Sequence, residues 1–180
     1  MRVIAGTYRG KILKEFSLSS TKPTLDRVKE SLFSSIQFDL IGARVLDLFA
    51  GTGALGIEAL SRGAKHVDFV DANIDAIKII KQNLQGIKGE YNVTKSDYLQ
   101  FLSNTKSQQN KYDIVLLDPP FDTNYANKAI DYIITNNLLN DGGIIMYEKL
   151  YITPFEFNAK GYTFKQKKYG TVGVVKIVKD

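Results

Sequence analysis

Short apolar runs alternate with longer segments of helical periodicity along most of the chain. The apolar runs have the length and residue types of buried strands; they are Arg44–Leu48, His66–Val70, Tyr91–Lys95, Tyr112–Leu117 and Ile144–Tyr147. The periodic segments between them predict helices at Ala54–Arg62, Asn73–Leu84 and Tyr125–Asn136. Strands separated by helices form right-handed βαβ units, so the pattern predicts a doubly wound, mainly parallel α/β sheet.

The two ends of the chain depart from this rhythm. Tyr162–Lys168 and Val172–Val178 are strands joined across Gly170 with no helix between them, which predicts an antiparallel hairpin at the sheet edge. At the start, Arg2–Ala5 and Lys11–Lys14 predict a second, shorter β-hairpin. We expect a single domain in which residues 1–22 form an arm and residues 23–180 form the core.

Two further segments are less regular. Leu25–Gln37 predicts a helix, because its apolar residues recur at the spacing of one buried stripe. Tyr98–Leu102 predicts a short helix that gives way to a polar loop at Ser103–Asn110.

Composition removes several functional classes. The 180 residues contain no cysteine and one histidine, so neither thiolate metal sites nor disulfides are expected. No apolar run approaches the ~18 residues of a membrane span, and no apolar leader follows Arg2. We expect a cytoplasmic, metal-free protein that is a monomer and has no membrane partner.

Charge is distributed unevenly along the chain. Residues 1–30 carry seven bases and three acids, residues 31–158 carry eleven bases and fifteen acids, and residues 159–180 carry six bases and one acid. An acidic centre with basic ends suggests a small-molecule pocket in the middle and polyanion contacts from the termini.

A glycine loop follows the first core strand. Gly51-Thr52-Gly53 opens a segment of the G-x-G-x-x-G type, in which the backbone approaches a ligand closely. This pattern also serves dinucleotides, but Asp47 stands four residues before it and would repel a pyrophosphate. S-adenosylmethionine carries an ammonium and a sulfonium instead, so the loop favours that cofactor.

Two more acids follow the next two strands. Asp71 is placed to accept the ribose hydroxyls, and Asp97 to bind the adenine amino group or to cap a helix. The carboxyl ends of parallel strands share one edge of the sheet, where ligands of such folds bind.

The segment Asp118-Pro119-Pro120-Phe121 follows the strongly apolar fourth strand. Two prolines offer carbonyl acceptors and no backbone donors. The carboxylate of Asp118 and the carbonyl of Pro119 can therefore accept the two hydrogens of an amine on an aromatic base. Phe121 can stack on that base. The loop predicts methyl transfer to an exocyclic amine, with positioning as the protein's main contribution.

With these motifs in place, the chain resembles the guanine-N2 methyltransferases of small-subunit ribosomal RNA, the type that modifies guanine 966 of 16S RNA. The resemblance rests on the stretches MRVIAGTYRGKIL, TKPTLDRVKESLF, GARVLDLFAGTGALGIEALSRGA and DIVLLDPPF. It implies a Rossmann-like methyltransferase fold, the cofactor S-adenosylmethionine, and 16S ribosomal RNA in the small subunit as partner.

The resemblance also implies residue roles. The cofactor would be held by Asp47, Gly51, Thr52, Gly53, Asp71 and Asp97, and the target guanine by Asp118, Pro119, Pro120 and Phe121. The residues expected to contact RNA are Arg2, Arg9, Lys11, Lys14, Lys22 and Arg27. Lys22 departs from the family, which often has arginine there, so a bidentate phosphate grip is not available at this position.

Three alternatives remain at this level. A DNA or RNA adenine-N6 methyltransferase uses a similar acceptor loop, although 180 residues leave little room for a DNA target-recognition region. A nicotinamide-dependent oxidoreductase shares the glycine pattern. An RNA-binding module without activity would share the fold.

Overall fold

The computed structural model describes residues 1–16 and 26–180 and contains a seven-stranded sheet. The strands are β1 (Arg44–Leu48), β2 (His66–Asp71), β3 (Glu90–Lys95), β4 (Tyr112–Leu117), β5 (Leu139–Leu150), β6 (Tyr162–Tyr169) and β7 (Val172–Lys179). Their order across the sheet is β3-β2-β1-β4-β5-β7-β6. Strands β1 to β5 are parallel, whereas β7 is antiparallel to both β5 and β6. The predicted sheet and its C-terminal hairpin are both confirmed.

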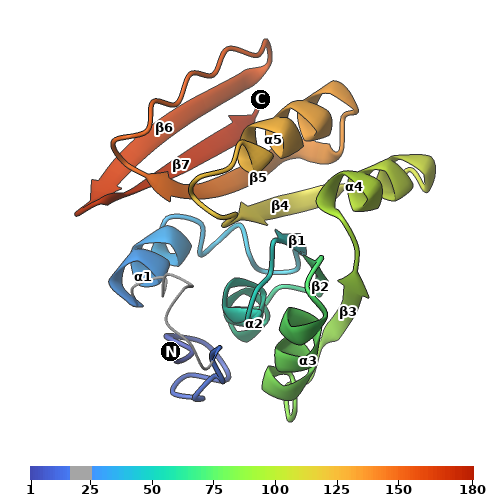
Figure 1. Ribbon diagram of the computed structural model, residues 1–180, viewed down its shortest axis with the longest axis vertical. Coiled ribbons are helices and arrows are strands. Elements are labelled where there is room, and N and C mark those ends of the chain that lie inside the picture. Colours follow the sequence, from blue (N-terminus) through green and yellow to red (C-terminus); the bar gives the residue numbers. More distant parts are fainter. Residues whose placement is uncertain (17–25) are drawn as a thin grey trace.

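Helices cover both faces of this sheet (Figure 1). They are α1 (Asp26–Ser34), α2 (Ala54–Ser61), α3 (Ile74–Asn83), α4 (Tyr98–Ser107) and α5 (Tyr125–Thr135). Helices α1, α2 and α3 pack on one face, which we call the α1 face, and α4 and α5 pack on the other, which we call the α5 face. This two-sided arrangement is that of a Rossmann-like α/β fold.

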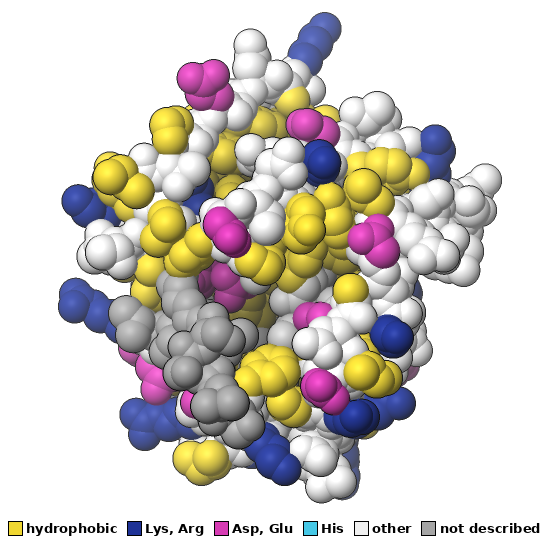
Figure 2. Space-filling model, viewed as in Figure 1, with side chains coloured by type: hydrophobic (Ala, Val, Ile, Leu, Met, Phe, Trp, Pro, Cys, Tyr) yellow, Lys and Arg dark blue, Asp and Glu magenta, His cyan; other side chains and the backbone are white. Residues whose placement is uncertain are grey.

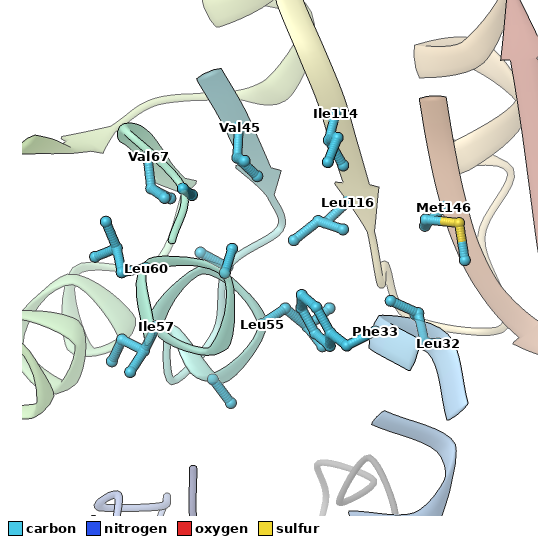
Figure 3. Close-up of a cluster of buried hydrophobic side chains, with 14 of the residues drawn as sticks. Leu32, Phe33, Val45, Leu55, Ile57, Leu60, Val67, Ile114, Leu116 and Met146 are labelled. Atoms are coloured by element: carbon cyan, nitrogen blue, oxygen red, sulfur yellow. The ribbon is translucent and has the colours of Figure 1, made fainter. Parts of the chain in front are cut away.

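The larger core lies between the sheet and the α1 face helices. Figure 3 shows its side chains from α1 and α2 directed at alternate residues of β1, β2, β4 and β5. The central strands β1, β2 and β4 are buried on both faces, which explains their continuous apolar runs in the sequence, whereas the edge strand β3 is largely exposed. The labelled residues are Leu32, Phe33, Val45, Leu55, Ile57, Leu60, Val67, Ile114, Leu116 and Met146.

Several element boundaries differ from the prediction. The polar loop expected at Ser103–Asn110 is wrong, because α4 continues to Ser107. Its hydroxyl side chains bond back to carbonyls one turn earlier: Thr105 donates to Phe101 and Ser107 donates to Ser103. Burial of Thr105 on the inner side of the helix supplies packing that composition alone does not reveal. Helix α1 ends earlier than the predicted Gln37: it stops at Ser34, and the chain continues in turns.

The prediction of two N-terminal strands is also wrong. The segment does fold back on itself, but its ladder reduces to a single antiparallel bridge between Arg2 and Ile12. The N–H groups of Ile4 and Ala5 donate to the carboxylate of Glu58 instead of to a partner strand. Residues 1–16 therefore pack against the core through side chains of α2.

Some predictions fall outside the described residues. Lys22, the boundary at residues 22 and 23, and the first residue of the helix predicted from Leu25 all lie within residues 17–25. Within the described parts of the chain, no helix is long and apolar enough to cross a membrane.

Candidate active site

The glycine loop joins the end of β1 to the start of α2. Gly51 and Gly53 both adopt positive φ angles of 56° and 79°, the left-handed conformation that glycine tolerates. A Cβ added to Gly51 would meet no heavy atom within 4 Å, so this side of the loop is open. The loop thus brings backbone close to the edge of the sheet and leaves space beside it for a ligand.

Asp71 at the end of β2 fixes the conformation of this loop. One carboxylate oxygen accepts the N–H of Gly51 at 2.8 Å, and the other accepts the N–H of Asn73 at 2.8 Å. The two strands are neighbours in register, with Leu48 opposite Val70. The predicted meeting of the glycine loop and Asp71 at one rim is what the structure shows.

Asp47 lies beneath the loop rather than in the open. Its side chain is 1% exposed, and one carboxylate oxygen accepts the N–H of Gly56 at 2.9 Å. Gly56 is the third residue of α2, so Asp47 supplies the N-terminal acceptor that the helix lacks from its own cap residue, Gly53.

The protonation of Asp47 reflects opposing effects. Burial raises the pKa of this carboxyl, the Gly56 hydrogen bond lowers it, and the nearby charge of Asp71 raises it; together these effects place the pKa at about 7. Desolvation therefore outweighs the hydrogen bond. A cationic ligand at the loop would favour the ionised carboxylate, whereas a second anion would not.

Asp97 follows β3 and caps α4. One of its carboxylate oxygens accepts the N–H groups of Leu99 and Gln100 at 2.9 and 3.2 Å. The capping alternative is therefore realised. A role toward adenine stays a prediction.

The segment Asp118–Phe121 directly follows β4, which pairs with β1 in the sheet. The carbonyl of Pro120 accepts both the N–H and the hydroxyl of Thr123, at 3.3 and 2.8 Å, which closes a turn. Asp118 and Phe121 are partly exposed and Pro119 is buried. Burial and the negative charge of Asp118 raise the pKa of Tyr147 on β5, so this carboxylate lies near the neighbouring strand end.

An aromatic cluster at the same rim has no counterpart among the sequence-based predictions. Phe49 lies 5.1 Å from the ring of Tyr98 and stacks on that of Tyr125 at 6.2 Å, centroid to centroid. Phe49 has a φ of 74°, a conformation that costs a non-glycine residue about 1–2 kcal/mol. Tyr125 is 40% exposed, so the cluster offers a flat aromatic surface. These residues come from three separate elements, and no local pattern links them.

The N-terminal segment is held by a second set of residues that the sequence did not reveal. The side-chain carbonyl of Asn83 accepts the N–H of Lys14, and its amide donates to the carbonyls of Lys14 and of Thr52 in the glycine loop. Glu58 accepts from the segment's backbone and lies 3.5 Å from the buried ammonium of Lys29. Burial lowers the pKa of Lys29, against the opposing effect of Glu58.

The predicted RNA-contacting residues fall into two groups. Arg2, Arg9, Lys14 and Arg27 have exposed side chains. Lys11 is half-buried and donates to the carbonyl of Gln85 at 2.8 Å, so its ammonium already has a protein partner. The structure thus brings the residues predicted to bind the cofactor and the target base to one rim, and holds the N-terminal segment against α2 and α3.

Comparison with known protein families gives one match over almost the whole chain. Residues 1–178 match the family described as conserved hypothetical protein 95. A relative from Haemophilus influenzae, named ribosomal RNA small subunit methyltransferase D, is 37% identical over 182 residues, which cover 97% of this chain and 90% of the relative.

Solved structures show the same fold. A putative methyltransferase, yhhF, from Escherichia coli superposes with a TM-score of 0.87 at 28% identity, covering 100% of this chain and 98% of that one. A Thermus thermophilus 16S rRNA N2 G1207 methyltransferase, solved with AdoMet and guanosine, superposes with a TM-score of 0.71 at 22% identity. It covers 92% of this chain and 45% of that one, and shows the fold alone.

Proposed function

We propose a function for this chain from the family to which it belongs, the one described as conserved hypothetical protein 95, together with the small-subunit ribosomal RNA methyltransferases D. The protein methylates the exocyclic N2 amine of a guanine in 16S ribosomal RNA. S-adenosylmethionine is the methyl donor. The observation that carries the proposal is the position of Asp118–Phe121. This acceptor loop ends β4, the strand beside β1, and so lies next to the glycine loop.

The residues at the rim fit the proposed donor. Bound S-adenosylmethionine would supply an electrophilic methyl group on a sulfonium. The open side of Gly51 leaves room for its methionine part. Asp71 would accept from the ribose with the lone pairs that its two backbone bonds do not use. Asp47 contributes negative charge from below rather than a direct contact.

The acceptor loop would hold the target by its hydrogens. The carboxylate of Asp118 and the carbonyl of Pro119 accept the two N–H bonds of the amine, because the Pro120 carbonyl is committed to the turn with Thr123. This orients the nitrogen lone pair toward the methyl group, and Phe121 stacks on the guanine. No strong base is required before attack, since the nitrogen loses its proton after the new bond forms. Catalysis then consists of positioning and electrostatics.

Methyl transfer into small ribosomal subunits from a strain lacking this protein tests the proposal. We expect incorporation of labelled methyl into 16S RNA and its recovery as N2-methylguanosine. Recovery as N6-methyladenosine, or incorporation into duplex DNA instead, would replace the proposal by an adenine-N6 activity.

Asp118→Ala locates the chemistry. We expect it to lower kcat by at least a hundredfold while the calorimetric affinity for S-adenosylmethionine stays within a few-fold. A large loss of cofactor affinity would show that Asp118 belongs to the donor site. Titration with NAD serves as the matched negative control for the glycine loop.

A further inference from the structure

Among residues 1–16 and 26–180, nothing buries the middle of strand β6, whose side chains are exposed from Thr163 to Lys168. Helix α1 and the turn after it cover β7, where the ammonium of Lys176 donates to the carbonyl of Ser35 at 3.1 Å. They contact β6 at its last residue, where the hydroxyl of Ser31 donates to that of Tyr169 at 2.5 Å. Lys165 and Lys167 lie on the α1 face of β6, opposite Lys176 and Val174 of β7, and both are exposed.

Within the described parts of the chain, the charges of Lys165 and Lys167 make no contact that stabilises the fold. Among residues 1–16 and 26–180, neither ammonium takes part in an ion pair or a hydrogen bond. The neighbouring strand differs, since Lys179 pairs with Asp141 at 2.8 Å. Lys165 stands directly opposite Lys176, and like charges in that position destabilise a sheet. Contacts within the described residues therefore do not account for lysine at these positions, and its remaining structural effect on this edge strand is to discourage pairing with other chains.

The register of the sheet places these lysines level with the acceptor loop. Leu117 is opposite Tyr147, Tyr147 is opposite Val175, and Val175 is opposite Gln166. Lys165 and Lys167 flank Gln166, so they lie in line with the end of β4 from which Asp118 emerges. Three strand spacings of about 4.8 Å separate β4 from β6, or roughly 14 Å in all. A few nucleotides of RNA span such a distance.

On the α5 face of β6, the side chains contact other parts of the protein. Phe164 packs against Phe155 and Phe157 at 5.7 Å, and the ammonium of Lys168 lies 4.7 Å over the ring of Tyr151. Those side chains are engaged within the protein. On the side seen in Figure 2, Lys and Arg side chains lie mainly around the margin, while the centre carries hydrophobic and acidic ones. On this face, positive charge available to a polyanion therefore lies mainly at the margin.

We propose that Lys165 and Lys167 bind the phosphate backbone of the RNA strand that carries the target nucleotide, on the side of the acceptor loop opposite the N-terminal segment. This rests on the proposed function, because it assigns a contact to the same RNA substrate. Lysine suits the role, since a flexible ammonium contacts phosphates without selecting sequence. The protein then contacts the RNA phosphate backbone on both sides of the target base.

The test replaces both charges by neutral groups. In the double variant Lys165→Gln/Lys167→Gln, we expect the KM for small ribosomal subunits lacking the modification to rise at least fivefold. We expect kcat and the affinity for S-adenosylmethionine to stay unchanged. The slope of log affinity against log salt should shrink by about 1.4, at roughly 0.7 for each phosphate that is no longer neutralised.

A matched control separates this from a general loss of charge. Lys106→Gln/Lys128→Gln removes two exposed charges from α4 and α5 on the other face, and should leave both KM and salt slope at wild-type values. Thermal unfolding of both variants shows that each still folds. If the wild type methylates subunits and the β6 variant behaves like the control, this inference is refuted and the proposed function stands. If the wild type transfers no methyl group to subunits, the proposed function fails first.

Discussion

The carboxyl of Asp47 should make the protein less stable as the pH rises. Its pKa of about 7 in the folded protein exceeds the ordinary aspartate value of 3.8, so the folded state binds the proton more tightly than the unfolded chain does. Stability from this group is present at low pH and is lost as the pH rises through 7. Three pKa units at about 1.4 kcal/mol each give a full range of about 4 kcal/mol, of which about 2.5 kcal/mol falls between pH 5 and pH 8.

Asp47→Asn isolates this contribution. The amide has nearly the same shape, can still accept from the N–H of Gly56 through its oxygen, and does not titrate. All other ionisable groups are common to both proteins, so their effects cancel in the difference. We expect urea unfolding without ligand to show the variant gaining about 2.5 kcal/mol relative to the wild type between pH 5 and pH 8.

The same change should weaken cofactor binding. A cationic ligand favours the ionised carboxylate, so calorimetry should show wild-type affinity rising about tenfold from pH 6 to pH 8 as the proton is lost. The variant should bind at least tenfold more weakly at pH 8 and lack this part of the pH dependence, which also corrects for titration of the ligand itself. A stability difference that stays constant with pH would refute the assignment of a raised pKa to Asp47. Equal affinities would refute its electrostatic role.

Three further changes test the packing around the site by urea unfolding and calorimetry. Gly56→Ala would place a Cβ 2.3 Å from the ring of Phe69, so we expect the free energy of unfolding to fall by about 1–3 kcal/mol. Combining it with Phe69→Leu should restore part of this stability, whereas an unchanged stability of the single variant would mean that the ring moves aside freely. Asn83→Ala removes three hydrogen bonds and should lower the free energy of unfolding by about 2–4 kcal/mol. Cofactor affinity should also fall, because the Thr52 carbonyl in the glycine loop loses its donor. Full retention of affinity would show that the contact of Asn83 with Thr52 does not support cofactor binding. Glu58→Gln removes the stronger of the two negative charges, Glu58 and Asp26, that act on the buried ammonium of Lys29. It should cost about 3 kcal/mol and speed proteolysis of residues 1–16; an unchanged cleavage rate would show that Glu58 does not anchor the segment.

The sheet was accessible to prediction because parallel strands buried on both faces leave continuous apolar runs. The apolar runs at Tyr112–Leu117 and Arg44–Leu48 predict strands with the observed boundaries. The prediction fails at two segments whose polar residues favour a loop. Residues 103–107 are helical in spite of their composition, and β5 begins at Leu139 rather than at Ile144. Burial on one side of an element supplies energy that a list of residues does not contain.

The candidate site was accessible to the extent that it is local. The glycine loop and the Asp118–Phe121 loop are short contiguous motifs, and the βαβ rule brings strand ends to one rim. The aromatic cluster of Phe49, Tyr98 and Tyr125 and the hydrogen bonds of Asn83 join residues from distant parts of the chain. Such sets leave no periodic or contiguous signal.

Neighbouring residues encode the alternation of strands and helices, the rim of strand ends, and the two loops that meet there, so these features could be predicted. Packing between distant elements buries Asp47 under α2 instead of leaving it exposed beside the ligand, and anchors the first sixteen residues through Glu58 and Asn83. It also places Lys165 and Lys167 level with the acceptor loop. These features escape prediction because desolvation, side-chain hydrogen bonding and cross-sheet register depend on which distant elements pack together.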